Sequence, residues 1–241
     1  MTTNPFRPPH VDESFSSESL THQQMDAYWR EGWLRFGTTF SRHSYFFCEG
    51  QTWTIQPLRV RLGEFVPSKS QRRTLRKNTD LTVRLGPAKL DDARCRLFNN
   101  HKRRFHDPNP DTLEGFIGAS PANCPCETVE IVAYENKRII AASYLDIGED
   151  SASSIHASYD LSHLRRRLGI CTMLWEMAHA RERGCVYYYP GFAFHEPSSM
   201  DYKKQFPAME WYDWRGHWLP LRAAVAKNIV EPPRQLELIP A

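Results

Sequence analysis

The sequence predicts a mixed α/β fold of the α+β type, because runs rich in Val, Ile, Thr, Tyr and Phe alternate with segments of helical periodicity. Its 241 residues are 41% hydrophobic and 12% aromatic, which is enough to bury a sizeable core. No apolar run approaches the roughly 18 residues that a membrane-spanning helix needs. The polar first residues lack the apolar core of a signal peptide, so the expected compartment is the cytoplasm.

The first third of the chain predicts an arm, a short helix and several strands. Residues 1–20 are rich in Pro and Ser, and we expect a flexible arm there. Thr21 and Gly32 are the predicted ends of a helix over residues 21–32. Strand-like runs follow at residues 33–40, 43–47 and 53–62. Pro57 lies inside the third run and predicts an edge strand or a bulge.

The remaining chain alternates more regularly between the two periodicities. We expect helices over residues 70–78, 89–105, 113–117, 170–183 and 200–206. We expect strands over residues 81–85, 128–134, 138–147, 154–159, 186–189 and 211–219. A helix, three antiparallel strands, a loop, a helix and a further strand therefore follow one another. This is the element order of an acetyltransferase-like (GNAT) domain.

Basic residues are clustered although the net charge is only +3. The clusters lie at residues 69–77, 101–104 and 165–167, and none of the three contains an acidic residue. Local basic clusters in a nearly neutral protein are typical of a footprint for a polyanion. The alternative interpretation of each cluster is an ordinary solvated face of the protein.

The six cysteines do not predict a metal site. Only Cys124 and Cys126 are close in sequence, and a structural zinc site needs four ligands. We therefore expect reduced thiols, no zinc and no iron–sulfur cluster.

The segment that follows residue 165 resembles the loop with which acetyltransferases bind the pyrophosphate of their cofactor. Arg166, Gly169 and Cys171 occupy the three positions of a Q/R-x-x-G-x-G/A pattern ahead of a helix. One alternative function is therefore an acetyl-CoA-dependent N-acetyltransferase.

Residues 58–80, LRVRLGEFVPSKSQRRTLRKNTD, carry a more specific resemblance. They are similar to the aminoacyl-tRNA–protein transferases, the arginyl- and leucyl-transferases of the N-degron pathway. Residues 186–206 resemble a second motif of that family, and residues 158–160 with 168–169 resemble a third. The resemblance extends over residues 25–220.

The resemblance implies two acetyltransferase-like halves packed together. We divide the chain into a flexible arm (1–20), an N-terminal transferase half (21–85), a C-terminal acetyltransferase-like half (86–225) and a tail (226–241). The implied function is transfer of an amino acid, arginine or leucine, from aminoacyl-tRNA to the N-terminal amine of an acceptor protein, which marks that protein for degradation. Aminoacyl-tRNA and acceptor N-termini would be the partners, with no further cofactor.

One departure from the family leaves other functions open. Members usually carry a set of cysteines in the N-terminal half, and here only Cys48 lies near one of those positions. A different amino acid, a different acceptor, or a non-catalytic homologue that binds tRNA or a degron therefore remains possible.

The resemblance also implies roles for individual residues. Asp160, Tyr159 and Tyr202 are the candidate catalytic residues, although Asp160 also fits a turn or helix cap and the run of tyrosines at 187–189 also fits a core strand. The candidates for binding tRNA or substrate are Arg59, Lys69, Ser70, Gln71, Arg72, Arg73, Arg76, Lys77, Arg166, Gly169, Tyr189, Met200 and Lys203.

Overall fold

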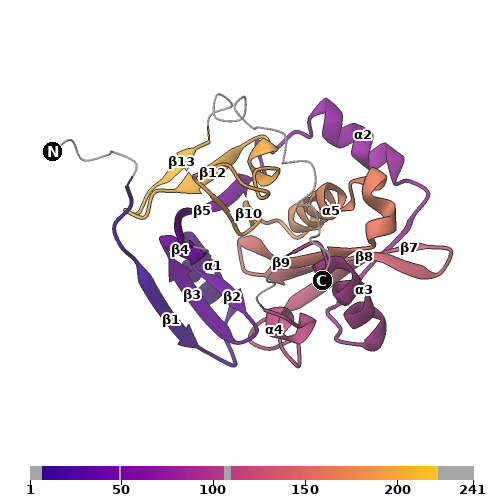
Figure 1. Ribbon diagram of the computed structural model, residues 1–241, viewed down its shortest axis with the longest axis horizontal. Helices are drawn as coiled ribbons and strands as arrows, with labels where there is room; N and C mark the ends of the chain where they lie inside the picture. Colours follow the sequence, from indigo (N-terminus) through magenta and orange to yellow (C-terminus); the bar gives the residue numbers. More distant parts are fainter. Residues whose placement is uncertain (1–6, 49, 106–109, 222–241) are drawn as a thin grey trace.

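The computed structural model describes residues 7–48, 50–105 and 110–221. Its main feature is a sheet of ten strands with the order β13-β12-β5-β10-β9-β8-β7-β6, in which β4 and β11 also pair with β5 (Figure 1). The strands are β4 (Tyr45–Cys48), β5 (Gln51–Arg61), β6 (Thr82–Pro87), β7 (Thr128–Glu135), β8 (Arg138–Ile147), β9 (Ser151–Tyr159), β10 (Tyr187–Tyr189), β11 (Phe192–Phe194), β12 (Met209–Tyr212) and β13 (Trp218–Pro220). Among the described strands, β9 and β10 are parallel, and the other neighbours are antiparallel.

Helices cover both faces of this sheet. They are α1 (His22–Arg30), α2 (Lys69–Lys77), α3 (Asp92–Lys102), α4 (Leu113–Ile117) and α5 (Leu168–Glu182), with 3-10 turns η1 (Leu161–Arg166) and η2 (Lys203–Gln205). α5 and α2 lie on one face, and α3 and α4 lie on the other (Figure 1). The helix expected over residues 200–206 is only the three residues of η2, because the chain becomes extended again at Phe206.

Two apolar layers hold the helices on the sheet. Leu145 and Ile147 of β8 pack with Met173 and Met177 of α5 on one face. On the other face, a second cluster contains Ala88, Leu97, Phe98, Leu113, Ile117, Val132, Ala142 and Tyr144. Burial of these side chains is the main favourable term in folding. The order α3, β7, β8, β9, α5 and β10 is the element order predicted for an acetyltransferase-like domain, and the predicted mixed α/β fold class is confirmed.

A smaller sheet of β1 (Asp12–Ser16), β3 (Thr39–His43) and β2 (Leu34–Phe36) packs beside the main one. The expectation of a flexible arm over residues 1–20 is therefore wrong for β1. Phe15 anchors this strand, because its ring lies 5.0 Å from the rings of both Trp33 and Phe40.

The prediction of an edge strand or bulge at Pro57 is also wrong. β5 is central, with β10 and β11 on one side and β4 and β12 on the other. Pairing with β4 ends at Thr54, and pairing with β12 begins at Leu58. The missing N–H of Pro57 faces the gap between those two strands, so no ladder bond is lost.

One continuous sheet joins the two predicted halves. β5 belongs to the first half, but it lies between strands of the second. The division at residue 85 stays a prediction, and residues 226–241 lie outside the described residues. Within the described part of the chain, no helix is long and apolar enough to cross a membrane.

Candidate active site

β9 and β10 stop pairing partway along β9, and we call the region beyond this point, around residues 154–159, the opening. The two strands are in register from Ser151 with Tyr187 to Ser153 with Tyr189. β9 then continues to Tyr159 with β8 as its neighbour, and no described strand lies on its other side. The register between β8 and β9 shifts next to Leu145 of β8, and such a bulge bends β9 at this point. Residues 154–157 of β9 are accordingly only half-buried.

A buried carboxylate lies at this opening. Glu176 of α5 is fully buried and accepts hydrogen bonds from the Tyr188 hydroxyl (2.5 Å) and the Ser154 hydroxyl (3.3 Å). Burial raises the pKa of Glu176 to about 7, although these hydrogen bonds and the nearby charge of Lys203 oppose the rise. A carboxylate with a pKa near neutrality is suited to exchange protons at physiological pH.

Lys203 provides the matching cation. Its ammonium donates to the Phe192 carbonyl over 3.1 Å. Burial lowers the pKa of Lys203 to about 8, while the charge of Glu176 opposes this. Gly191 lies beside this ammonium group, and its φ of +81° is in the left-handed region that favours glycine. Of the predicted substrate-binding residues, Lys203 is the one beside the buried carboxylate.

The opposite side of the opening is formed by aromatic and neutral groups. His156 of β9 bonds to the Ser158 hydroxyl at 2.9 Å, and its ring lies 4.2 Å from Phe116. Burial, together with the charge of Lys203, lowers the pKa of His156 to about 4. His101 of α3 lies 4.3 Å from the Tyr159 ring, and burial lowers its pKa to about 3. Both imidazoles are therefore neutral at pH 7.

The predicted catalytic residues are distributed around this opening. Tyr202 is 39% exposed, directly before Lys203, and Tyr159 lies at the end of β9. Asp160 instead caps η1, where it accepts hydrogen bonds from the Ser162 backbone and hydroxyl and pairs with Arg138. Burial acts against the charged form, but these partners hold the pKa of Asp160 below its usual value. A catalytic role for Asp160 stays a prediction, and both its oxygens are already engaged.

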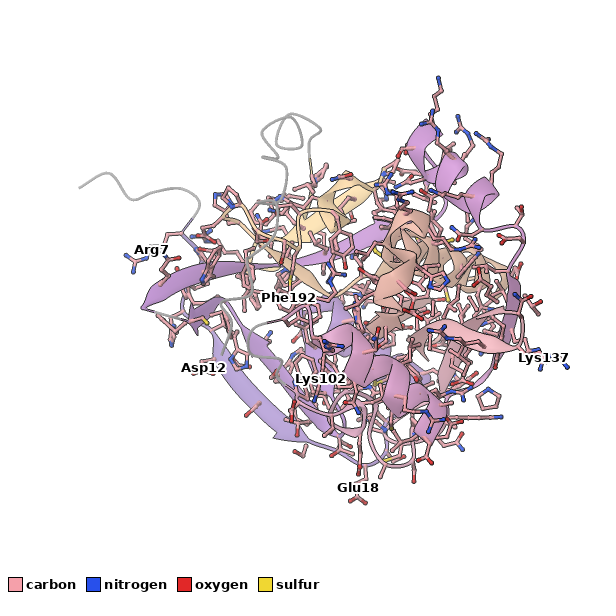
Figure 2. All side chains as sticks on the ribbon, turned by 45° about the vertical axis from the view of Figure 1, so that its right-hand side comes forward. Arg7, Asp12, Glu18, Lys102, Lys137 and Phe192 are labelled. Carbon is pink, nitrogen blue, oxygen red and sulfur yellow. The ribbon has the colours of Figure 1, made fainter. Side chains whose placement is uncertain are left out.

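Two of the three basic clusters meet on one surface. Ser68 and Gln71 form a capping box that begins α2, so Gln71 is buried as a structural residue. Lys77 donates to the Arg165 carbonyl, and Arg167 donates to the Ser70 hydroxyl. The exposed cations of this surface, which we call the α2 patch, are Lys69, Arg72, Arg73, Arg76, Lys77, Arg165 and Arg167. None of them forms an ion pair with a described residue, and side chains of α2 project away from the protein (Figure 2).

Other predicted binding residues have structural partners. Arg59 pairs with Glu210 at 2.7 Å and is stacked between Tyr187 and Trp218. Tyr189 is buried, and burial raises its pKa to about 12. Met200 packs against the core on the α5 face.

The predicted cofactor loop is also engaged within the protein. Arg166 forms a bidentate pair with Asp80 (2.8 and 2.9 Å) and bonds to Glu135 at 2.7 Å. A Cβ on Gly169 would lie 3.2 Å from the Tyr159 ring, so this glycine makes room for a side chain of β9. Arg166 and Gly169 therefore connect elements of the fold rather than present a free surface.

Glu176 is not among the residues predicted from the sequence, although the sequence contains a signal for it. Met173 and Met177 are apolar residues of the helix predicted over residues 170–183, and Glu176 lies on the same side, three residues after Met173. A carboxylate on an apolar helix face is rare unless it has partners. That position marks it as a candidate functional residue.

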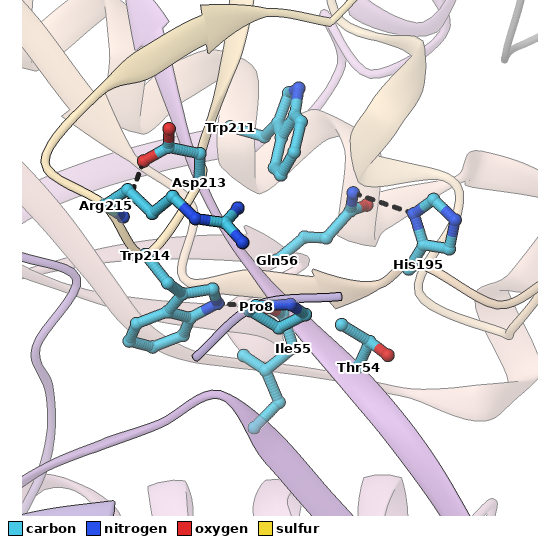
Figure 3. A pocket seen from close by; sticks show the side chains of 9 residues that line it. All are labelled: Pro8, Thr54, Ile55, Gln56, His195, Trp211, Asp213, Trp214 and Arg215. Carbon is cyan, nitrogen blue, oxygen red and sulfur yellow. Dashed lines mark hydrogen bonds between the residues drawn. The ribbon is translucent and has the colours of Figure 1, made fainter. Parts of the chain in front are cut away.

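Two pockets lie elsewhere in the described part of the chain, and neither is lined by Glu176 or Lys203. One is a cavity of about 20 Å³, enough for roughly one water molecule. Its walls, drawn in Figure 3, are Pro8, Thr54, Ile55, Gln56, His195, Trp211, Asp213, Trp214 and Arg215. The other is an open groove of about 300 Å³ between β1 and β4. Across the described residues, no group of three or more His, Cys, Asp or Glu side chains is placed to hold a metal.

The chain is similar to known proteins in sequence and in fold. Residues 93–213, half of the chain, match the model of the family described as arginine-tRNA-protein transferase, C terminus. The aspartate/glutamate leucyltransferase of Stenotrophomonas maltophilia is 26% identical over 66% of each chain, and that of Hahella chejuensis is 28% identical over 76% of this chain and 78% of its own. Among solved structures, FemX has a TM-score of 0.45 at 8% identity over 61% of this chain and 55% of its own. L-PGS from Bacillus licheniformis has a TM-score of 0.41 at 12% identity over 58% of this chain and 48% of its own.

The described residues form a mixed α/β protein with a buried carboxylate and a lysine at the point where two strands separate. The chain belongs to the arginine-tRNA-protein transferase family.

Proposed function

We propose that this protein transfers leucine from leucyl-tRNA to the N-terminal amine of acceptor proteins that begin with Asp or Glu, in the cytoplasm. The names of the two bacterial relatives support this donor and these acceptors. The observation that carries the proposal is the pair of Glu176 and Lys203 at the opening between β9 and β10. Their pKa values of about 7 and about 8 suit one group to accept a proton and the other to donate one.

The reaction needs two proton movements. The acceptor amine attacks the ester carbonyl of the aminoacyl group, so a C–N bond forms and the bond to the ribose oxygen breaks. Glu176 takes the proton that the amine loses, with its carboxylate oriented by Tyr188 and Ser154. Lys203 gives a proton to the leaving ribose oxygen, and its charge stabilises the oxyanion formed on the way. The ester is already activated, so no covalent enzyme intermediate is required.

The α2 patch is the proposed binding surface for tRNA. Affinity for nucleic acid comes mainly from contacts with phosphates, and exposed, unpaired Arg and Lys side chains make such contacts. The alternative, a basic but merely solvated helix, predicts no effect of these residues on tRNA binding. The same proposal includes a consequence for the acceptor protein: the added amino acid marks it for degradation, provided that this residue acts as a degradation signal.

The test is a transfer assay with matched donors and acceptors. Leucyl-tRNA, arginyl-tRNA and acetyl-CoA, each labelled in the group to be transferred, are incubated with peptides that begin with Asp, Glu, Asn or Ala and are otherwise identical. The proposal predicts labelled leucine on the peptides that begin with Asp and Glu. Label from arginyl-tRNA alone would correct the donor. Label from acetyl-CoA alone, or no label from any donor, would overturn the proposed activity.

A further inference from the structure

Arg104 is an exposed arginine just after α3, and it forms no ion pair with a described residue. Five others each pair with a carboxylate: Arg35 with Asp146, Arg59 with Glu210, Arg94 with Glu130, Arg138 with Asp160, and Arg166 with Asp80. The protein therefore neutralises most guanidinium groups at the sheet. Arg104 has no such partner among the described residues, and its guanidinium lies beside Tyr159 at the end of β9.

The surroundings of Arg104 place its charge at the mouth of the candidate active site. It follows the C-terminal end of α3, and its guanidinium carbon lies 5.3 Å from the centre of the Tyr159 ring. One guanidinium nitrogen lies 3.5 Å from Nε2 of His101. Neither neighbour carries a negative charge at neutral pH, so the guanidinium keeps its capacity to bind an anion.

Tyr202 responds to the charges of both Arg104 and Glu176. Burial raises the pKa of the Tyr202 phenol to about 12, the charge of Arg104 opposes this rise, and the charge of Glu176 adds to it. Arg104 belongs to the α3 face of the sheet and Glu176 to the α5 face. Strand β9 connects the two groups. Arg104 lies 3.5 Å from His101, whose ring lies 6.1 Å from that of His156 on β9. Ser154, two residues before His156, donates to Glu176.

This arrangement is complementary to one kind of N-terminal residue. An acceptor that begins with Asp or Glu carries an α-amine and a carboxylate joined by a short carbon chain. The amine must reach Glu176 in order to lose its proton. We propose that Arg104 binds the side-chain carboxylate of the acceptor's first residue and thereby selects acidic over neutral N-termini, an assignment that rests on the proposed transfer reaction. Arg favours this role because its planar fork can hold a carboxylate through two parallel hydrogen bonds.

The same guanidinium could instead contact a phosphate of the tRNA. The observations favour the carboxylate, since the α2 patch already offers a surface of unpaired cations for phosphates. The two ligands also predict different results. A phosphate contact would affect every acceptor equally, whereas a carboxylate contact would affect only acidic ones.

The test compares Arg104→Met with Arg103→Met, a control that removes the neighbouring, exposed arginine. Binding of peptides that begin with Asp or Asn is measured without tRNA, and transfer to the same peptides is measured with it. The wild type and Arg103→Met should prefer Asp over Asn, on the order of 10- to 100-fold for a hydrogen-bonded charge. Arg104→Met should bind and use the two peptides alike, and Arg104→Lys should recover part of the preference.

Either of two results would overturn the inference. An unchanged Asp preference in Arg104→Met would show that another group reads the carboxylate. An equal loss on both peptides, with weaker tRNA binding, would assign Arg104 to a phosphate. Failure of the proposed function would look different from both results, because the wild type would then transfer no amino acid to either peptide. Peptide binding by the wild type and by Arg104→Met would still test the role of Arg104.

Discussion

Tyr188 donates a hydrogen bond of 2.5 Å to Glu176 where β10 separates from β9. A strand that ends early thus supplies the hydroxyl that orients the proposed base.

If Glu176 accepts the proton, Glu176→Gln should lower kcat/KM for transfer by about 10²- to 10⁴-fold, with tRNA binding unchanged. The control is Glu182→Gln, which changes an exposed carboxylate on the same helix. Equal activity of the two variants would exclude Glu176 as the base.

The pH dependence of transfer should reflect Glu176 and Lys203 as a coupled pair. Activity needs Glu176 ionised, so kcat/KM should rise as the pH increases through about 7. It needs Lys203 protonated, so kcat/KM should fall above about pH 8. Because the groups interact, the two limbs report values for the pair. Lys203→Met should remove the alkaline limb, and a profile that keeps both limbs in this variant would contradict the assignment.

Stability should also respond to the protonation of Glu176. Its pKa is raised in the folded protein from 4.5 to about 7, so the folded state binds the proton more tightly than the unfolded state. This contribution to stability is complete below about pH 4.5 and is lost as the pH rises through about 7. The free energy of unfolding of the wild type, relative to Glu176→Gln, should therefore decrease over that interval. Urea unfolding at several pH values measures it, and a constant difference would argue against a buried proton at this site.

Helix α2 and Glu176 show which features of this protein can be predicted from the sequence and which cannot. The pattern of Ser68 and Gln71 defines the start of α2 because a capping box is a local interaction. The partners of Glu176, in contrast, come from β9 and β10, and their proximity depends on where two strands separate. The ion pair of Arg59 is equally hard to predict from the sequence, since its partner Glu210 is 151 residues away along the chain. Local signals therefore predict the elements, and the site requires their packing.

The α2 patch should determine how tRNA affinity depends on salt. Arg73→Ala and Arg76→Ala should each weaken tRNA binding and reduce the slope of log K against log salt by about 0.7 to 0.9 for each phosphate that the variant no longer neutralises. Lys89→Ala, at an exposed position before α3, is the matched removal of a charge elsewhere. Filter binding over a range of salt concentrations gives the slopes. The same slope in all three variants would place the tRNA on another surface.

Arg59 should affect stability rather than tRNA affinity. Removal of one partner from a buried ion pair typically costs about 3–5 kcal/mol, because the other charge is left unpaired. Arg59→Met should therefore lower the free energy of unfolding by roughly that amount, with a further decrease because its stacking on Tyr187 and Trp218 is removed. The double variant Arg59→Met/Glu210→Gln should recover part of the stability. A stable Arg59→Met protein with weak tRNA binding would instead restore the role that the sequence predicts for Arg59.

If Glu176 and Lys203 carry out the proposed transfer, an acceptor peptide gains one amino acid from tRNA at its N-terminus. The intact mass of a peptide that begins with Asp, after incubation with leucyl-tRNA and either the wild type or Glu176→Gln, tests this. We expect a peptide longer by one leucine with the wild type, and little or none with the variant. An unmodified peptide with the wild type and every aminoacyl-tRNA tested would contradict it, and the protein would then be a binding member of its family.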